Sequence, residues 1–421
     1  MTKVLVMWGP NKYDVLLNTE KTVGDFMLDL QKLTGVPVDR QKLMMRRKQL
    51  KAADSWEAGS IKEGVKFMLV GTAELPPEPI DPPSDADDEI NENDEENGGI
   101  PASKLKKICQ GLPNTANNCF LNASIQSLRA LPQAEKLLET AVIQPGAGAA
   151  AVPSNIAATL SGLMKSFPQG FNAAYQTLRQ ANPALFAAVD EETGFPKQQD
   201  ATESYFYLLS NLGEALGNPM RKLFEIGYHV TRTCNETGKV EEFDEFDNRI
   251  PVYINEETRQ IEQGINMDQD EEGKDEETKQ LVNYHVHRAI NHLPQYLNLQ
   301  VCRFTYKKDE NITAKLLRRV QHPFRIDMLP WLSPELRAEV AADREAGKRD
   351  SGFYNLKVVL THKGRSANSG HYITHCLYGD TWFRFDDQKV TEVDEDAIVQ
   401  LSGSGDWHCS ILLIYERIDT E

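Results

Sequence analysis

The sequence predicts an α+β protein with a small N-terminal domain, an acidic linker and a large second domain. Its 421 residues exceed the size of one average domain. A stretch near residue 90 combines five prolines with many carboxylates and has neither Lys nor Arg. Beyond this stretch, helical periodicity gives way to alternating strand patterns toward the C-terminus. We therefore place the domains at residues 1–75 and 104–421, with the linker at 76–103.

The composition is that of a folded globular chain. Hydrophobic residues make up 40% and charged residues 26%, both near the globular average. The 46 Lys and Arg against 63 Asp and Glu leave a net charge of -17, which argues against a nucleic-acid binder. No apolar run approaches the roughly 20 residues of a membrane helix, and no signal peptide is evident. We expect a cytoplasmic and nuclear protein without membrane contact.

The first 75 residues have the pattern of a β-rich domain. Alternating apolar residues around Gly9–Asn11 predict a hairpin, followed by a helix and by strands at Leu43–Leu50 and Lys66–Val70. The residues that indicate the hairpin and the helix face are Val4, Val6, Tyr13 and Val15, and Val23, Phe26, Met27 and Leu30. This order of elements resembles a ubiquitin-like β-grasp, and Gln41–Leu50 resembles the central strand of ubiquitin.

Two stretches are too acidic to form a core. The linker at 76–103 is predicted to be disordered, because it has almost no large apolar side chains to bury. A second acidic tract, Met267–Gln280, interrupts the large domain, and we expect it to be a mobile surface loop.

Cys119 is the candidate nucleophile among six scattered cysteines, whose spacing predicts neither disulfides nor a zinc site. It directly precedes a helical pattern of Leu121, Ile125 and Leu128. At a helix N-terminus, unpaired N–H groups and the helix dipole favour the nucleophilic thiolate over the thiol. A lone cysteine is more often an inert small hydrophobic residue. Only a nearby base would favour the interpretation of Cys119 as a nucleophile.

A candidate base lies in a predicted hairpin near the C-terminus. Gly379–Asp380 suits a two-residue turn between two alternating runs. This register puts His371 and Asp386 on one face as diagonal neighbours and points Asp387 to the other face. A change of one residue in the length of the turn would exchange the two aspartates. Cys119, His371 and Asp386 then fit the roles of nucleophile, general base and orienting carboxylate. Taken alone, the histidine could be structural and Asp386 a solvated turn residue.

Asn114 is a candidate for stabilising an oxyanion. It precedes Cys119 by five residues, so its amide could lie beside the Cys119 N–H and supply a second donor to a tetrahedral intermediate. The alternative is a local Asx turn, which the sequence does not exclude.

Three separated motifs resemble those of the ubiquitin-specific protease family. The Cys-box is matched at Gly111–Asn122, a Gln-box at Gln198–Glu203, and the His-box at Ser369–Tyr372 followed by Trp382–Asp387. The resemblance implies a papain-like domain of palm, thumb and fingers, with the fingers within Asn218–His292. It also implies hydrolysis of the isopeptide bond after the C-terminal glycine of ubiquitin, with ubiquitin and ubiquitinated proteins as partners and with no cofactor or metal.

The same resemblance assigns roles to individual residues. Cys119 would attack, His371 would relay the proton, Asp386 would orient His371 and Asn114 would stabilise the oxyanion. The residues assigned to binding of ubiquitin's tail are Gln199, Asp200, Ser369, Gly370 and Tyr372. Gln199 and Asp200 suit helix capping equally well, because a helical pattern follows them.

The Cys-box departs from the family pattern at four positions. Thr115, Ala116, Asn118 and Phe120 stand where Leu, Gly, Thr and Tyr are usual. If position 116 requires a positive φ, its Cβ costs about 1 kcal/mol or more. One alternative is therefore a catalytically weak or inactive ubiquitin-binding proteasome adaptor. A second is a protease for another ubiquitin-like modifier.

The N-terminal domain lacks the Gly-Gly tail of ubiquitin and is predicted to be a docking module. Its combination with a protease domain resembles the proteasome-associated member of the family, which implies docking on the proteasome regulatory particle and activation there. Met44 and Val70 are candidate docking residues, although either could equally belong to the core. The small polar segment Gly364–Gly370 is predicted to be a mobile gate beside His371.

Overall fold

The structure is a computed structural model in which the chain divides into two units, Met1–Asn91 and Glu92–Glu421. Each unit is described by itself. The described residues are 2–8, 11–19, 21–34, 36, 38, 41–45, 48–52, 54, 56, 61, 65–70, 102–115, 117–189, 196–275, 278–307, 312–366, 369–403 and 408–418. The predicted linker lies outside them except for Ala102 and Ser103, which belong to the first helix of the second unit.

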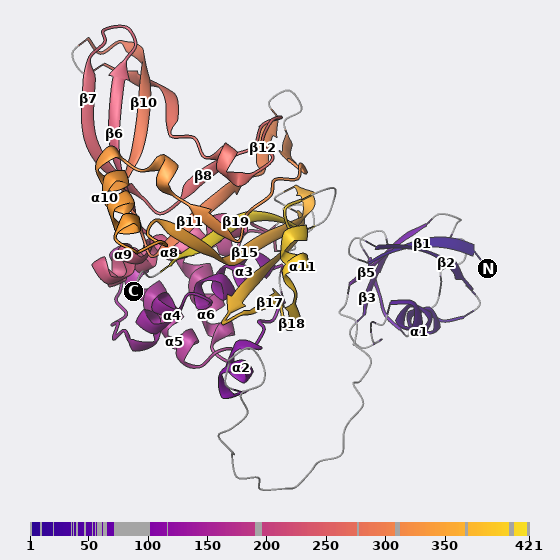
Figure 1. The fold of residues 1–421 in the computed structure, drawn as a ribbon. Coiled ribbons are helices and arrows are strands. Elements are labelled where there is room, and N and C mark those ends of the chain that lie inside the picture. The colour runs from indigo at the N-terminus through magenta and orange to yellow at the C-terminus, as the bar shows by residue number, and fades with distance from the viewer. Residues whose placement is uncertain are drawn as a thin grey trace, which may run out of the picture. The chain divides into compact units, whose positions relative to one another are not determined.

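The first unit is a five-stranded sheet in the order β2-β1-β5-β3-β4 with one helix, α1 (Figure 1). Its elements are β1 (Thr2–Trp8), β2 (Asn11–Leu17), α1 (Val23–Thr34), β3 (Lys42–Met45), β4 (Lys48–Leu50) and β5 (Lys66–Val70). The central pair β1–β5 is parallel and the other pairs are antiparallel. This is the predicted ubiquitin-like β-grasp. One detail was wrong, because the single strand expected at Leu43–Leu50 is the hairpin β3–β4.

Helix α1 shows why this unit folds. Its apolar side chains recur at three- and four-residue spacing, and all four of those predicted to face the sheet, Val23, Phe26, Met27 and Leu30, are at most 4% exposed. They pack against the inward residues of the strands, such as Val4, Val6 and Phe67. The predicted helix face is confirmed.

The second unit begins with a group of helices, seen together below the sheet in Figure 1. They are α2 (Ala102–Ile108), α3 (Cys119–Arg129), α4 (Pro132–Thr140), α5 (Val152–Lys165), α6 (Phe171–Ala181), α7 (Pro183–Phe186), α8 (Ala201–Leu216) and α9 (Asn218–Phe224). Helix α3 lies at their centre, and every one of its residues is buried. This burial makes α3 a rigid base for anything at its N-terminus.

An eight-stranded sheet packs against these helices. Its order is β18-β17-β16-β15-β19-β11-β8, with β14 paired to β15. The strands are β8 (Ile250–Tyr253), β11 (Tyr296–Cys302), β14 (Arg325–Asp327), β15 (Phe353–Ser366), β16 (Ser369–Tyr378), β17 (Thr381–Asp386), β18 (Lys389–Val393) and β19 (Cys409–Arg417). Ser127 of α3 and Thr374 of β16 share a buried hydrogen bond of 3.0 Å between their hydroxyl oxygens, which ties helix to sheet.

A separate four-stranded sheet, β7-β6-β10-β9, projects from this body (Figure 1). Its strands are β6 (Ile226–Cys234), β7 (Val240–Asp247), β9 (Asp268–Lys274) and β10 (Leu281–His292), within the segment predicted as the fingers. Strand β9 corrects a prediction, because the acidic tract expected to be a loop pairs with β10 from Asp268 to Lys274. Cross-strand partners explain this: Asp268 and Asp270 accept hydrogen bonds at 2.8 and 3.0 Å from His287 and His285.

The remaining elements lie outside these two sheets and the first group of helices. They are η2 (Ala149–Ala151), η3 (Ile261–Gly264), the hairpin β12 (Phe304–Lys307) and β13 (Ile312–Lys315), η4 (Leu329–Trp331), α10 (Pro334–Glu345) and α11 (Glu395–Gln400). Among the described residues, no helix combines the length and apolar character needed to span a membrane. The α+β class, with a ubiquitin-like domain followed by a mixed helix and sheet domain, agrees with the prediction.

Candidate active site

Helix α3 begins at Cys119, as the apolar spacing predicted. Leu121, Ile125 and Leu128 are each fully buried, so the helix is held by its core face. The nucleophile candidate itself is 3% exposed. Asn118 occupies the N-cap position but makes no side-chain cap bond, so the first N–H groups of α3 are not covered by that side chain.

The hairpin of β16 and β17 places the histidine and an aspartate together. Tyr378 pairs with Thr381 and Thr374 with Phe385, which is the predicted register around Gly379–Asp380. At the open end of the hairpin, His371 Nε2 lies 2.6 Å from Asp386 Oδ1. The turn therefore brings together the pair that the sequence indicated.

Cys119, at the start of α3, also interacts with His371 strongly enough to affect the pKa of its imidazole. Burial alone would lower the pKa of His371, but the hydrogen bonds and charges of Asp386 and Cys119 raise it to about 10. The hydrogen bond from His371 in turn lowers the pKa of Asp386. The site favours the imidazolium form of His371.

Asp387 is a functional candidate that the sequence reasoning missed. Its φ of 53° differs from the extended backbone assumed in predicting that it points away. Its Oδ2 lies 4.0 Å from His371 Nε2, and its two oxygens accept bonds of 2.8 Å from the amides of Asn122 and Asn114. Burial raises the pKa of Asp387, and the two amides oppose this effect. The recurrence of asparagine at 114, 118 and 122 was the available signal.

The structure places Asn114 beside the predicted site, with its amide already engaged. Its Nδ2 donates to Asp387, and its Oδ1 accepts a bond of 3.0 Å from the backbone N–H of Asn118. The second bond is the kind of local contact that the alternative interpretation expected. One N–H of the Asn114 amide remains beyond the bond to Asp387, and the oxyanion role stays a prediction.

The Gln-box residues begin helix α8. Asp200 is its N-cap, and its Oδ1 accepts bonds of 2.7 Å from Thr202 N–H and 3.4 Å from Glu203 N–H. Asp200 therefore caps helix α8, as the alternative interpretation of this residue expected. Gln199 is half-buried, and its amide donates to Ala184 O at 3.4 Å without capping the helix.

The His-box residues differ in exposure. Ser369 and Gly370 are exposed, and a side chain at Gly370 would collide with the carbonyl oxygen of Lys363, so only glycine fits. Tyr372 is 1% exposed and packs on His362 with ring centroids 4.5 Å apart. Its side chain therefore belongs to the core, and its contact with ubiquitin's tail stays a prediction.

The predicted gate is also shorter than expected. Strand β15 ends at Ser366 and strand β16 begins at Ser369, and these two residues are paired. Positions 367 and 368 of the predicted segment lie outside the described residues, as does Ala116, so the expectation about its φ is not addressed.

A neutral imidazole adjoins the pair. The rings of His408 and His371 are 6.1 Å apart, and His408 Nδ1 lies 3.2 Å from Thr361 Oγ1. Burial, reinforced by the charge of His371, lowers the pKa of His408 to about 3. His408 therefore adds no second positive charge near neutral pH.

His371, Asp386 and Asp387 also have the composition of a metal site. One ligand atom from each lies within 4.8 Å of the others, the one such group in the described part of the chain. Their hydrogen bonds to one another and to the amides of Asn114 and Asn122 account for their geometry without an ion.

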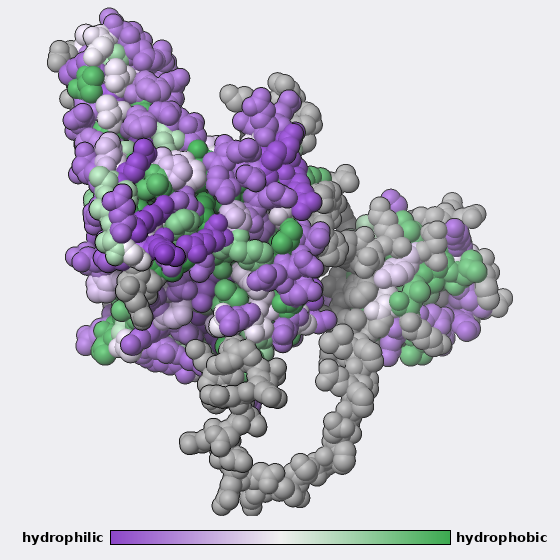
Figure 2. Space-filling model, viewed as in Figure 1, coloured by the Kyte–Doolittle hydropathy of each residue, from purple (hydrophilic) through white to green (hydrophobic). Residues whose placement is uncertain are grey.

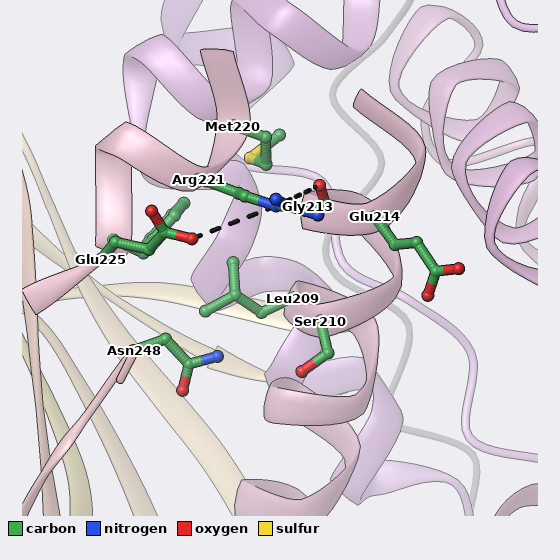
Figure 3. Close-up of a pocket in the computed structure, with 9 residues that line it drawn as sticks. Leu209, Ser210, Gly213, Glu214, Met220, Arg221, Glu225 and Asn248 are labelled. Atoms are coloured by element: carbon green, nitrogen blue, oxygen red, sulfur yellow. Dashed lines mark hydrogen bonds and ion pairs between the residues drawn. The ribbon is translucent and has the colours of Figure 1, made fainter. Parts of the chain in front are cut away.

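A pocket of about 500 Å³ lies elsewhere, between α8 and α9 (Figure 3). Arg221 crosses it, with its Nε 3.0 Å from Gly213 O and 4.0 Å from a carboxylate oxygen of Glu225. None of the predicted catalytic residues lines this pocket. The candidate catalytic residues lie at the N-terminus of α3 instead.

The surface of the four-stranded sheet is mainly hydrophilic (Figure 2). Its exposed large hydrophobic side chains are Val240, Phe243, Phe246 and Leu281. Phe246 is 66% exposed at the edge of a pocket of about 510 Å³ between this sheet and β8.

The helix-borne cysteine facing a sheet-borne histidine and aspartate defines the class of a papain-like cysteine protease. A family model described as ubiquitin carboxyl-terminal hydrolase matches residues 110–415. The chain belongs to the ubiquitin carboxyl-terminal hydrolase family. It is a deubiquitinating cysteine protease.

Full-length relatives support this assignment. The chain is 29% identical over 475 residues to ubiquitin carboxyl-terminal hydrolase 14 of Caenorhabditis elegans, covering 99% of this chain and 93% of the relative. It is 28% identical over 483 residues to ubiquitin carboxyl-terminal hydrolase 6 of Schizosaccharomyces pombe, covering 100% and 99%. The fold is similar to a chain of the SAGA DUB module of Ubp8, Sgf11, Sus1 and Sgf73 bound to monoubiquitin. That match has a TM-score of 0.55 and 19% identity, covering 76% of this chain and 72% of the other.

Proposed function

We propose that Cys119, His371 and Asp386 carry out deubiquitination as nucleophile, acid–base and orienting carboxylate. The observation that supports this most is the 2.6 Å bond between His371 and Asp386, together with the interaction of Cys119 with the same imidazole. The Cys119 thiolate attacks the carbonyl carbon of ubiquitin's last glycine, and the His371 imidazolium protonates the departing amine. Water then attacks the thioester and gives one proton to His371, and collapse of the intermediate releases the Cys119 thiolate and the C-terminal carboxylic acid of ubiquitin, which loses its proton to solvent.

In the same proposal, Asn114 and the Cys119 backbone N–H stabilise the oxyanion of both tetrahedral intermediates. Gln199, Ser369 and Gly370 contact the tail of ubiquitin in this proposal, because all three are at least partly accessible. Ser369 and Gly370 directly precede His371, and Gln199 lies just before helix α8. Asp200 and Tyr372 support this cleft from the helix start and from the core. Asn118, one of the four departures from the Cys-box, is engaged in the hydrogen bonds of the site. The family match supports the protease better than the inactive-adaptor alternative.

Labelling with a ubiquitin probe that carries a C-terminal electrophile tests the nucleophile. The full-length chain should form a covalent adduct, and Cys119→Ala should abolish it. Cys109→Ala, which changes an exposed cysteine two residues before the Cys-box, is the matched control and should label normally. An adduct that persists in Cys119→Ala would contradict the assignment.

We also propose that the ubiquitin-like domain docks the enzyme on the regulatory particle of the proteasome, in the cytoplasm and the nucleus. Met44 supports this proposal, because it is partly exposed opposite Met68, which is 47% exposed. The side chain of Val70 lies outside the described residues. Docking is proposed to raise kcat/KM by about tenfold or more, equivalent to roughly 1.4 kcal/mol. Equal kcat/KM with and without saturating proteasome would contradict activation.

A further inference from the structure

Three asparagines and Asp387 form a continuous series of hydrogen bonds beside the catalytic pair. Asn118 Nδ2 lies 3.0 Å from Asn122 Oδ1, and Asn122 Nδ2 lies 2.8 Å from Asp387 Oδ1. Asn114 Nδ2 lies 2.8 Å from Asp387 Oδ2. The series connects the segment before the nucleophile with the turn that follows Asp386.

Asn118 fixes the direction of these bonds. Its Oδ1 accepts from the backbone N–H of Thr115 at 3.0 Å, and a backbone N–H can only donate. Its Nδ2 must therefore face the carbonyl of Pro113, at 2.9 Å, and Asn122. Asn122 then presents its oxygen to Asn118, so its nitrogen faces the acceptor-only carboxylate of Asp387. Asn118 is fully buried, where an unmade bond is costly.

The backbone joins the same two segments. Leu112 N–H donates to Asp387 O at 2.9 Å. A side chain at Gly111 would collide with the carbonyl oxygens of Asp387 and Gln388, so the segments are in close contact. The adjacent residue, Asp386, orients His371. A shift of this turn would therefore move the carboxylate on which the imidazolium depends.

We propose that Asn118 is a positioning residue for catalysis, acting through Asn122 and Asp387 to hold the Asp386 turn against the Cys119 segment. The inference rests on the proposed roles of Cys119, His371 and Asp386. Asn118 stands where Thr is usual in the family pattern, and this inference gives that departure a physical role. In this role Asn118 touches neither substrate nor the reacting atoms.

The test compares full-length Asn118→Ala with wild type on ubiquitin carrying a C-terminal amide fluorophore. We expect kcat to fall about tenfold, equivalent to roughly 1.4 kcal/mol, with KM changed less than about twofold. The alkaline limb of the kcat profile should move to lower pH, because a displaced Asp386 stabilises the imidazolium less. Asn298→Ala is the control. Asn298 is also fully buried and bonded, to Tyr205 and Asn248, away from the site, so its replacement should leave kcat and the pH limb unchanged.

Two further variants separate positioning from packing. Asn118→Asp preserves the shape and the acceptor for Thr115 N–H, but it replaces the donor with a carboxylate oxygen that faces Pro113 O and Asn122 Oδ1. This repulsion should displace Asn122, so the variant should be as impaired as Asn118→Ala. Asn122→Ala should lower kcat by itself, and adding Asn118→Ala should cause little further loss. Recovery by Asn118→Asp, additive losses, or an Asn118→Ala variant with normal kcat would overturn the inference and leave the proposed function standing. A wild-type chain that is inactive even with proteasome would overturn the proposed function, and the inference with it.

Discussion

His371 Nε2 lies 2.6 Å from Asp386 Oδ1 and 4.0 Å from Asp387 Oδ2, so two consecutive carboxylates face one imidazole at different distances. Their environments also differ. The hydrogen bond from His371 lowers the pKa of Asp386, whereas burial raises that of Asp387. Asp386 binds the imidazole directly, and Asp387 is held by two asparagine amides. Asp386 therefore orients the base, whereas Asp387 anchors the turn.

This division predicts unequal effects of substitution. Asp386→Asn should lower kcat roughly 10²- to 10⁴-fold, because loss of the carboxylate destabilises the imidazolium and allows the wrong tautomer. Asp387→Asn should lower kcat by about tenfold or less, since one side-chain oxygen remains to accept a hydrogen bond from an asparagine amide. Steady-state hydrolysis of a fluorogenic ubiquitin substrate measures both. A larger loss in Asp387→Asn would show that the anchoring carboxylate is the dominant one.

The pH dependence follows from the raised pKa of His371. Its value of about 10 keeps the imidazolium protonated through neutral pH, so protonation of the leaving amine should fail only as the pH rises through about 10. In Asp386→Asn, the remaining effect of burial should bring the alkaline limb of kcat/KM to lower pH. Profiles from pH 6 to pH 10.5 measure this limb. An identical limb in the two proteins would mean that Asp386 does not set the pKa of His371.

The sequence was informative wherever one local pattern decides the outcome. Spacing of Leu121, Ile125 and Leu128 places the start of α3, and a two-residue turn sets the β16–β17 register. Asp387 was misjudged because alternation applies to extended backbone, and its positive φ turns the side chain back toward the site. The amides of Asn114 and Asn122 bond Asp387, which is more than 260 residues away in the sequence. No local sequence pattern could predict these long-range contacts.

Strand β9 shows the same limit. Its acidic sequence, from Asp268 to Lys274, predicts a loop when considered alone, since it has little to bury. Its stability as a strand comes from β10, whose His285, His287 and Arg288 are its charged and hydrogen-bonding partners. Partners of this kind are visible only after the strands are paired.

The proposed docking face can be tested with one pair of variants. Met44→Arg puts a charge on the face shared by Met44 and Met68 and should weaken co-purification with proteasomes tenfold or more. Leu28→Arg is the matched control, because Leu28 is 50% exposed on α1 and tolerates a charge. Quantitative pull-down of proteasome subunits is the measurement, with deletion of residues 1–75 as the lower limit. Equal binding by Met44→Arg and wild type would place the contact elsewhere.

The last prediction concerns Gly111, whose backbone touches the turn after Asp386. In Gly111→Ala, the new Cβ would meet the carbonyl oxygens of Asp387 and Gln388, so the turn or the Cys119 segment has to move. We expect a loss of about 1–3 kcal/mol in the free energy of unfolding and a lower kcat. Gly162→Ala is the control, because a Cβ at this exposed position of α5 meets nothing within 4 Å and favours the helix by roughly 1 kcal/mol. Urea unfolding and fluorogenic assays measure both quantities. Normal kcat in a folded Gly111→Ala would show that the close approach at Asp387 does not set the position of the neighbouring Asp386.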